Sequence, residues 1–256
     1  MDDTPTSPEF SLSDAKVVMR QQWRDLLFLH WSFDPAELAA TLPEGLTPHT
    51  FEGRAYVGVV PFLMRNVRPS WFPAVPGLSH FGELNLRTYA QTADGRTGVW
   101  FYSLDAHQAV AVWIARTLFR LPYHRAFIRQ EVSGEHRRYF WQRGRPRTPS
   151  MQPAFAYDAP SEADCRPAEP GTLDHFLVER YRLWSGGENQ ERLFHGQVRH
   201  TPYRVGPPSL EQWDDRLFGL NGLAPPGRAP DHAAWSPGVD VEVLPLRELR
   251  PPDPHG

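Results

Sequence analysis

The chain has 256 residues, of which 40% are hydrophobic and 12% aromatic, and its formal net charge is −3 at pH 7. This length suits one large domain with a real core, and the charge gives no electrostatic reason to expect a nucleic-acid partner. No stretch approaches the roughly 20 apolar residues of a membrane span, and the acidic, polar start does not resemble a secretory signal. We therefore expect a cytoplasmic protein that associates with neither nucleic acid nor membrane.

Reactive side chains are scarce. Cys165 is the only cysteine, which excludes an internal disulfide and a thiolate metal cluster. Lys16 is the only lysine among 27 lysine and arginine residues, and it lies in a polar N-terminal segment. We expect Lys16 to lie outside any cavity, so that catalysis of any kind proceeds without a lysine Schiff base.

Residues 1–12 are rich in Ser, Thr, Pro and acidic side chains, which predicts a disordered segment. We expect residues 13–250 to form a single domain and residues 251–256 to form a tail. The apolar run at 23–33 predicts a buried strand. Asp34, followed by Pro35 and Glu37, predicts the start of a short helix.

Several hairpins follow. Residues 46–64 predict one hairpin, in which Pro61 marks an edge strand or a bulge because it has no N–H. Residues 81–90 and 98–104 predict the clearest hairpin, and residues 125–143 a third. Later strands are expected around Phe155 and Tyr157, at 191–200 and at 238–246. Consecutive hairpins indicate antiparallel pairing.

Three later helices are predicted from their caps. Asp105 followed by Gln108 predicts a helix over 106–119, and we favour this capping role of Asp105 over a catalytic one. Thr172 predicts a short helix that runs into a strand. Ser209, followed by Gln212, predicts a helix at 209–218. Together the elements predict an α+β fold, with a curved or barrel-like antiparallel sheet and a few short helices.

The run FLHWSFDPAELAATLPEGLTPHTFEGRAYVGVVPF, followed in order by FGELNLRTYA, GVWFYSLDA, GTLDHFLVERY and RHTPY, resembles the YqjF-like family of uncharacterised bacterial proteins. The resemblance extends from residue 20 to residue 204. It implies the acetoacetate-decarboxylase-like fold, a β-barrel or cone with a central cavity. The enzyme that names this fold forms a Schiff base through a lysine in a barrel strand. The comparable segment here, 99–105, has no lysine, so the resemblance implies the fold without the mechanism.

Polar and mainly apolar side chains alternate along the strand predicted at 81–90: Glu83, Asn85, Arg87 and Tyr89 against Leu84, Leu86 and Thr88. Glu83 and Arg87 are about 13 Å apart at Cα, too far to pair readily with each other. The polar face is either the solvated face of an antiparallel strand or the lining of a cavity. We expect the cavity, because the fold implied by the resemblance contains one there.

In such a cavity Arg87 would receive a carboxylate or phosphate through its planar guanidinium. Glu83 would act as an acid or base if burial raised its pKa, and a structural role for the two residues stays open. Arg180 could be a second cation, or it could pair with Glu179 or a surface acid. His30, within an apolar strand, is either a hydrogen-bonded core residue or part of the pocket wall.

No nucleotide-binding loop, nucleophile elbow or metal-ligand spacing occurs, so we expect no cofactor and no metal. The sequence predicts a small-molecule-binding protein with a polar cavity for an anionic organic ligand. Three classes stay open: an acid–base lyase or decarboxylase-like enzyme without a Schiff base, a non-catalytic ligand sensor, and a structural or interaction protein with a filled cavity. The sequence also leaves a homo-oligomer open.

Overall fold

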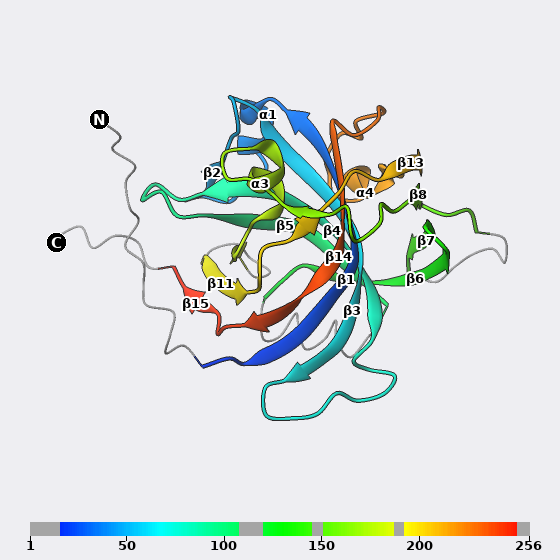
Figure 1. The fold of residues 1–256 in the computed structure, drawn as a ribbon. Helices are drawn as coiled ribbons and strands as arrows, with labels where there is room; N and C mark the ends of the chain where they lie inside the picture. Colours follow the sequence, from blue (N-terminus) through cyan, green and yellow to red (C-terminus); the bar gives the residue numbers. More distant parts are fainter. Residues whose placement is uncertain (1–15, 108–119, 145–150, 187–191, 250–256) are drawn as a thin grey trace.

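The computed structural model describes residues 16–107, 120–144, 151–186 and 192–249. Strands dominate this part of the chain, with three short helices among them (Figure 1). The elements are β1 (Met19–Phe33), α1 (Pro35–Ala39), β2 (Thr47–Pro48), β3 (Ala55–Pro69), β4 (Phe81–Gln91), β5 (Thr97–Ala106), β6 (Tyr123–Ser133), β7 (His136–Arg143), β8 (Phe155–Asp158), β9 (Arg166–Pro167), α3 (Leu173–Val178), β10 (Arg182–Ser185), β11 (Phe194–Arg199), β12 (Arg204–Val205), β13 (Ser209–Gln212), α4 (Arg216–Gly219), β14 (His232–Val243) and β15 (Arg247–Glu248).

One large mixed sheet has the strand order β13-β8-β7-β6-β5-β10-β11-β14-β1-β3-β4-β2, and β4 also pairs with β5. The pairings therefore follow a closed path from β5 through β10, β11, β14, β1, β3 and β4 back to β5. The long strands β1, β3 and β14 run side by side through the middle of the molecule (Figure 1). The expectation of a purely antiparallel sheet is wrong, because β5 pairs in parallel with both β6 and β10.

An irregularity in β1 lies opposite Pro61 of β3. The pairing of β1 with β3 shifts register between Arg24 and Leu29, and Asp25 within this interval has a φ of 54°. Pro61 lies opposite this interval of β1, and on its other side it pairs with Leu84 of β4. The expected bulge of β3 at Pro61 is wrong, because the extra residue lies in β1 and β3 pairs with β4 through Pro61 without a register shift. β3 is not an edge strand either, because β1 and β4 flank it on both sides.

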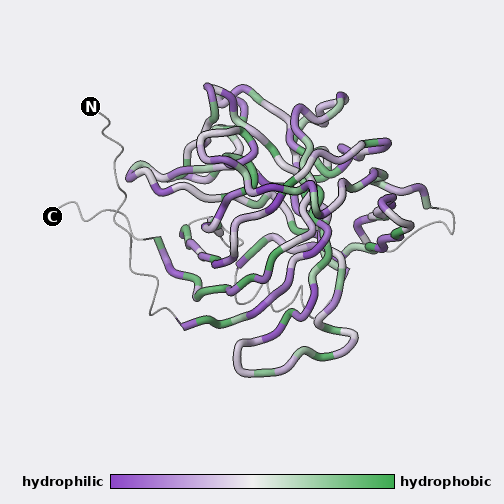
Figure 2. The backbone as a smooth tube through the Cα atoms, in the orientation of Figure 1, coloured by the Kyte–Doolittle hydropathy of each residue, from purple (hydrophilic) through white to green (hydrophobic). Residues whose placement is uncertain are grey.

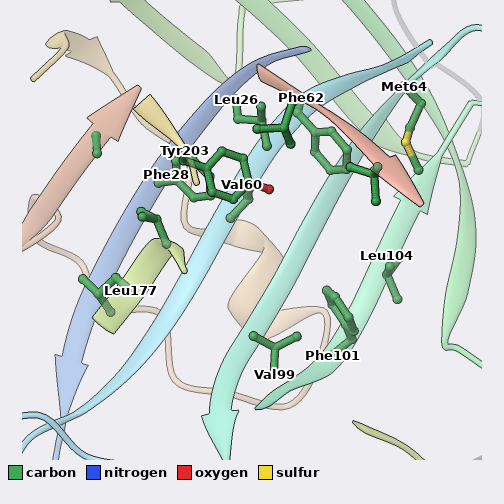
Figure 3. Packing of buried hydrophobic residues seen from close by; sticks show 14 of the residues in the cluster. Leu26, Phe28, Val60, Phe62, Met64, Val99, Phe101, Leu104, Leu177 and Tyr203 are labelled. Atoms are coloured by element: carbon green, nitrogen blue, oxygen red, sulfur yellow. The ribbon is translucent and has the colours of Figure 1, made fainter. Parts of the chain in front are cut away.

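Both faces of the sheet are buried. One apolar cluster includes Leu26, Val60, Phe62 and Phe101, which project from the same side of the sheet (Figure 3). The cluster on the opposite side contains Leu27, Leu29, Val57, Val59, Leu84 and Leu86. The tube in Figure 2 shows hydrophobic and hydrophilic stretches alternating along the strands. Burial on both faces strongly specifies the strand register, since a slip of one residue would exchange the two faces.

Two of the predicted helix starts are confirmed. Asp34 accepts a hydrogen bond from the amide of Ala36 at the start of α1, where Pro35 is the first residue. Thr172 accepts one from the amide of His175 at the start of α3.

Two other predicted helix starts are wrong. Ala106 is the last residue of β5, so no helix begins there, and residues 108–119 lie outside the described residues. Ser209 and Gln212 belong to β13, whose backbone pairs with β8, and the helix α4 begins only at Arg216. Within the described residues, no helix has the length and apolar character needed to cross a membrane.

Candidate functional site

The polar side chains of β4 are buried rather than solvated. Exposure is 2% for Glu83, 6% for Asn85, 9% for Arg87 and 0% for Tyr89. They share a face with Phe81, a member of the cluster in Figure 3, whereas the intervening leucines pack on the other side. The interpretation of this row as a solvated strand face therefore does not hold. Buried charges of this kind need partners or a ligand.

Glu83 lies at one end of the row. Its Oε2 accepts a hydrogen bond from the Tyr123 hydroxyl at 3.1 Å, and its carbonyl accepts one from the Tyr139 hydroxyl at 2.7 Å. Burial raises the pKa of Glu83 to about 8, against the opposing effect of hydrogen bonds from Tyr123 and Asn85. At neutral pH the carboxyl group therefore carries a proton and can donate it.

Two arginines lie at the other end of the row. Arg87 Nη2 donates to the carbonyl of Leu177 at 3.1 Å, and more weakly to the Tyr89 hydroxyl at 3.4 Å. The Arg180 guanidinium lies 4.3 Å from the ring centroid of Phe176 and 5.1 Å from that of Tyr89. Burial, assisted by Arg87, lowers the pKa of Arg180 to about 10.

Several N–H groups of these arginines have no acceptor. Within the described residues, Arg87 Nε and Arg180 Nε and Nη2 are buried without a hydrogen-bond partner, and neither guanidinium pairs with a carboxylate. Glu179, the neighbour expected as an alternative partner of Arg180, instead accepts from the Tyr203 amide at 2.7 Å and from the Tyr181 hydroxyl. The guanidinium groups of Arg87 and Arg180 therefore place positive charge and unpaired N–H donors at this end of the row, as far as the described residues show.

His30 is completely buried beside this cationic end. Its Nε2 lies 2.7 Å from the Tyr89 hydroxyl oxygen, and its Nδ1 lies 3.0 Å from Nδ1 of His232. His232 Nε2 in turn lies 2.6 Å from Oδ1 of Asp174. His30 is therefore a hydrogen-bonded core residue, and its ring contacts Tyr89 of the polar row.

Strand register explains how these groups come together. His232 on β14 pairs with His30 on β1, His30 pairs with Gly58 on β3, and Gly58 pairs with Arg87 on β4. A Cβ atom on Gly58 would lie only 2.8 Å from His30 Cδ2. The absence of a side chain at Gly58 thus gives the His30 ring room to reach Tyr89.

Three residues of this region were not predicted from the sequence. Asp174 and His232 lie far apart along the chain, and no motif links them. His49 lies 4.8 Å from Phe176 between ring centroids, and its buried Nδ1 has no partner among the described residues. Burial, followed by the charge of Arg180, lowers the pKa of His49 to about 4. The sequence placed His49 only within the hairpin predicted at 46–64.

Asp105 is not a helix cap. Its carboxylate lies on the opposite face of the sheet from Glu83 and accepts hydrogen bonds from Trp141 Nε1 at 2.8 Å and from Arg143 Nη2 at 2.8 Å. Arg143 Nε adds a third contact at 3.1 Å. The residue belongs to a buried ion pair that ties β5 to β7.

Lys16 precedes β1 and is exposed. The strand β5, which contains the segment 99–105, has no lysine. An imine between a substrate and a lysine therefore has no side chain from which to form inside the sheet.

One group among the described residues could hold a metal ion: His136, Asp158 and Glu211, whose ligand atoms lie within 4.8 Å of one another. His136 Nδ1 already contacts Asp158 Oδ1 at 2.9 Å, and none of the three is buried. A separate hollow of about 440 Å³ opens to solvent beside α4 and includes Gln142, Pro153, Trp213 and Asp214 in its lining. None of the site residues predicted from the sequence lines this hollow.

The chain is similar to acetoacetate-decarboxylase-like structures over nearly its whole length. Acetoacetate decarboxylase from Legionella pneumophila superposes with a TM-score of 0.62 at 14% identity and covers 98% of each chain. The enduracididine biosynthesis enzyme MppR, complexed with pyruvate, gives a TM-score of 0.61 at 17% identity and covers 96% of each chain. An acetoacetate decarboxylase-like enzyme from Sphingomonas wittichii RW1 gives 0.59 at 15% identity and covers 92% of this chain and 94% of its own. These likenesses show the fold.

Sequence comparison gives the family. The protein YqjF of Bacillus subtilis (strain 168), itself described as uncharacterized, is 34% identical over 239 residues, which are 93% of this chain and 95% of YqjF. The model of the DUF2071 family, described as an uncharacterized conserved protein, matches residues 20–240. The chain therefore belongs to the DUF2071 family of YqjF-like proteins and has an acetoacetate-decarboxylase-like fold.

Proposed function

We propose that this protein binds a small organic anion on the inner face of its sheet, between Arg87 and Arg180. The observation that carries the proposal is that both guanidinium groups are largely buried, yet have unpaired N–H donors and no carboxylate partner within the described chain. Leaving buried charge unpaired costs several kcal/mol. A bound carboxylate would satisfy both groups through charge-assisted hydrogen bonds.

The surroundings favour an organic anion over a bare inorganic one. The Arg87 guanidinium carbon lies 5.5 Å from the ring centroid of Phe28, and Phe176 lies against Arg180. Aromatic rings offer apolar contact to a carbon skeleton while the arginines hold the charged end. The closed path of strand pairing supports a barrel-like interior that encloses the ligand. MppR, which shares the fold, has a solved structure in complex with pyruvate, a small carboxylate.

Glu83 places a carboxyl group at the end of the proposed site that lies away from Arg87. A ligand held at Arg87 would extend along Asn85, whose Oδ1 has no partner among the described residues, toward the Glu83 carboxyl group. With its pKa raised to about 8, Glu83 is matched to proton transfer near neutral pH. We assign it the role of acid or base in lyase or decarboxylase-like chemistry that does not pass through an imine.

Binding can be tested by isothermal titration calorimetry with pyruvate, acetoacetate and inorganic phosphate. We expect a carboxylate to bind the unaltered protein, and Arg87→Met and Arg180→Met each to raise its Kd at least tenfold, which corresponds to about 1.4 kcal/mol. Arg138→Met is the matched control, because Arg138 is an exposed arginine of β7. The proposal fails if none of the three probes binds saturably, or if both arginine variants bind like the control.

Turnover separates an enzyme from a binder. Release of carbon dioxide from acetoacetate would be measured with the unaltered protein and with Glu83→Gln, which keeps the shape of the side chain but cannot exchange a proton. We expect turnover to fall at least a hundredfold in the variant while the Kd stays within a few-fold. Binding without turnover in either protein would instead identify a ligand sensor and refute the catalytic role of Glu83.

A further inference from the structure

We propose that Asp174, His232, His30 and Tyr89 form a proton relay that delivers one proton from the protein surface to the anion held by Arg87 and Arg180. The inference deepens the proposed function and rests on it for the identity of the proton acceptor. The relay itself can be tested without any ligand.

The four residues form a continuous line of short contacts from solvent to interior. The Asp174 side chain is 51% exposed, the His232 side chain 9% exposed, and His30 and Tyr89 are 0% exposed. The successive donor–acceptor distances along the line are 2.6, 3.0 and 2.7 Å. Proton transfer between neighbours requires separations of this size.

The contact between the two Nδ1 atoms allows two arrangements of the protons. Because two nitrogens face each other, one must donate and the other must accept. When His232 is neutral, its Nε2–H donates to Asp174, so His30 donates from Nδ1 and accepts at Nε2 from the Tyr89 hydroxyl.

When His232 carries a second proton, its Nδ1–H donates to His30. His30 then donates from Nε2 to Tyr89, and the Tyr89 hydroxyl is free to donate to the carbonyl of Leu177, which lies 2.7 Å away. Every donor on the line then has an acceptor.

The second arrangement converts into the first by releasing one proton inward. The Tyr89 hydroxyl proton passes to the bound anion, the His30 Nε2 proton passes to the Tyr89 oxygen, and the His232 Nδ1 proton passes to His30 Nδ1. His232 ends neutral, with its Nε2–H still bonded to Asp174. The only net change is the transfer of one proton from the His232 imidazolium to the anion, so atoms and charge balance.

The charges around the line disfavour a stored proton on His30. His30 faces Arg87, Arg180 and His232, and burial together with these cations lowers its pKa well below the usual value. His232 instead faces the Asp174 carboxylate, whose pKa the contact lowers. The neighbouring Asp231 pairs with Arg228 and accepts from the Ser32 amide, so its carboxylate is engaged elsewhere. His30 thus conducts the proton without holding it.

The tautomer of neutral His30 is a direct measurement of the relay. In protein labelled with ¹⁵N-histidine, long-range ¹H–¹⁵N correlation spectra would be recorded from pH 5 to pH 9 without ligand. We expect the single proton of neutral His30 to lie on Nδ1 at high pH and on Nε2 at low pH. A His30 tautomer that stays fixed across this range would overturn the relay.

Substitution of Asp174, at the exposed end of the relay, can be compared with a matched substitution of Asp231. Asp174→Asn removes the carboxylate charge that faces His232, so the tautomer change should move to lower pH. Asp231→Asn removes an acid of equal charge that does not touch the ring, and it should move the change far less. Equal effects of the two substitutions would show a general charge effect and contradict the relay.

Saturating pyruvate separates this inference from the proposed function. A carboxylate on Arg87 and Arg180 offsets their positive charge, so the tautomer change should move to higher pH. If pyruvate, acetoacetate and phosphate all fail to bind but the His30 tautomer changes with pH, the proposed function fails and the ligand-free relay stands. If one of them binds but the tautomer stays fixed, the relay fails and the binding site stands.

Discussion

At the scale of single residues, the buried carboxyl group of Glu83 has the most direct thermodynamic consequence. In the folded chain its pKa is about 8, against 4.5 for an ordinary glutamate. Between these values the folded state holds a proton that the unfolded state releases. Glu83 therefore contributes stability that is fully present below pH 4.5 and is lost as the pH rises through 8.

Replacing Glu83 with Gln should remove this pH dependence. We expect Glu83→Gln to gain stability relative to the unaltered protein as the pH rises from 5 to 9, by about 3–5 kcal/mol in total. Urea unfolding at pH 5, 7 and 9 measures the difference. Glu44→Gln, at an exposed glutamate, should follow the unaltered protein. A constant difference between the Glu83 variant and the unaltered protein would show that Glu83 is ionised in the fold.

At the scale of elements, the alternation of polar and apolar side chains along β4 could be predicted. A period of two residues follows from strand geometry alone and does not depend on the neighbouring strands. The caps at Asp34 and Thr172 were equally local, since a cap acts within three residues of its own position. Asp105 and Ser209 showed similar local patterns but were assigned wrongly. Arg143 and Trp141 engage Asp105, and β8 pairs with the backbone of Ser209. These tertiary partners outweigh the local preference for a helix.

The two interpretations of Asp105 predict different losses of stability. A lost helix cap costs about 1 kcal/mol, whereas removal of one partner from a buried ion pair costs roughly 3–5 kcal/mol. We expect Asp105→Ala to fall in the second range in chemical denaturation, because Arg143 would lose two hydrogen bonds inside the sheet. Asp94→Ala breaks an exposed pair with Arg96 and should cost about 1 kcal/mol or less. A similar loss in both variants would contradict a structural role for the Asp105 pair.

For the whole molecule, the resemblance to a known family predicted more of the fold than the residue patterns did. Hairpin signals predict that consecutive strands pair in antiparallel fashion. The parallel pairing of β5 with β6 and β10 joins strands that other segments of the chain separate, so no hairpin signal predicts it. The burial of Glu83 and Arg87 on one face was predictable, because the two residues share one strand. Asp174, His49 and His232 could not be predicted, because only the three-dimensional register brings them to the same place.

The position of the only lysine yields a prediction about the chemistry of the whole chain. Borohydride reduction in the presence of pyruvate or acetoacetate should trap no adduct at Lys16, because this side chain is exposed and lies outside the sheet. Intact-mass and peptide mass spectrometry would detect such an adduct. Lys16→Arg should keep any turnover unchanged, and a trapped substrate at Lys16 together with loss of turnover in this variant would establish an imine mechanism.

The pairing of β1 with β14 also bears on how the protein is made. Residues 19–30 complete their ladder only with residues 232–243, so a chain emerging from the ribosome exposes one edge of β1 until β14 has been synthesised. Unpaired strand edges recruit other chains. A transcript truncated before residue 232 would therefore encode a product that lacks half of the histidine pair and is also prone to aggregate. Synthesis as far as β14 is thus a condition both for avoiding aggregation and for assembly of the histidine pair.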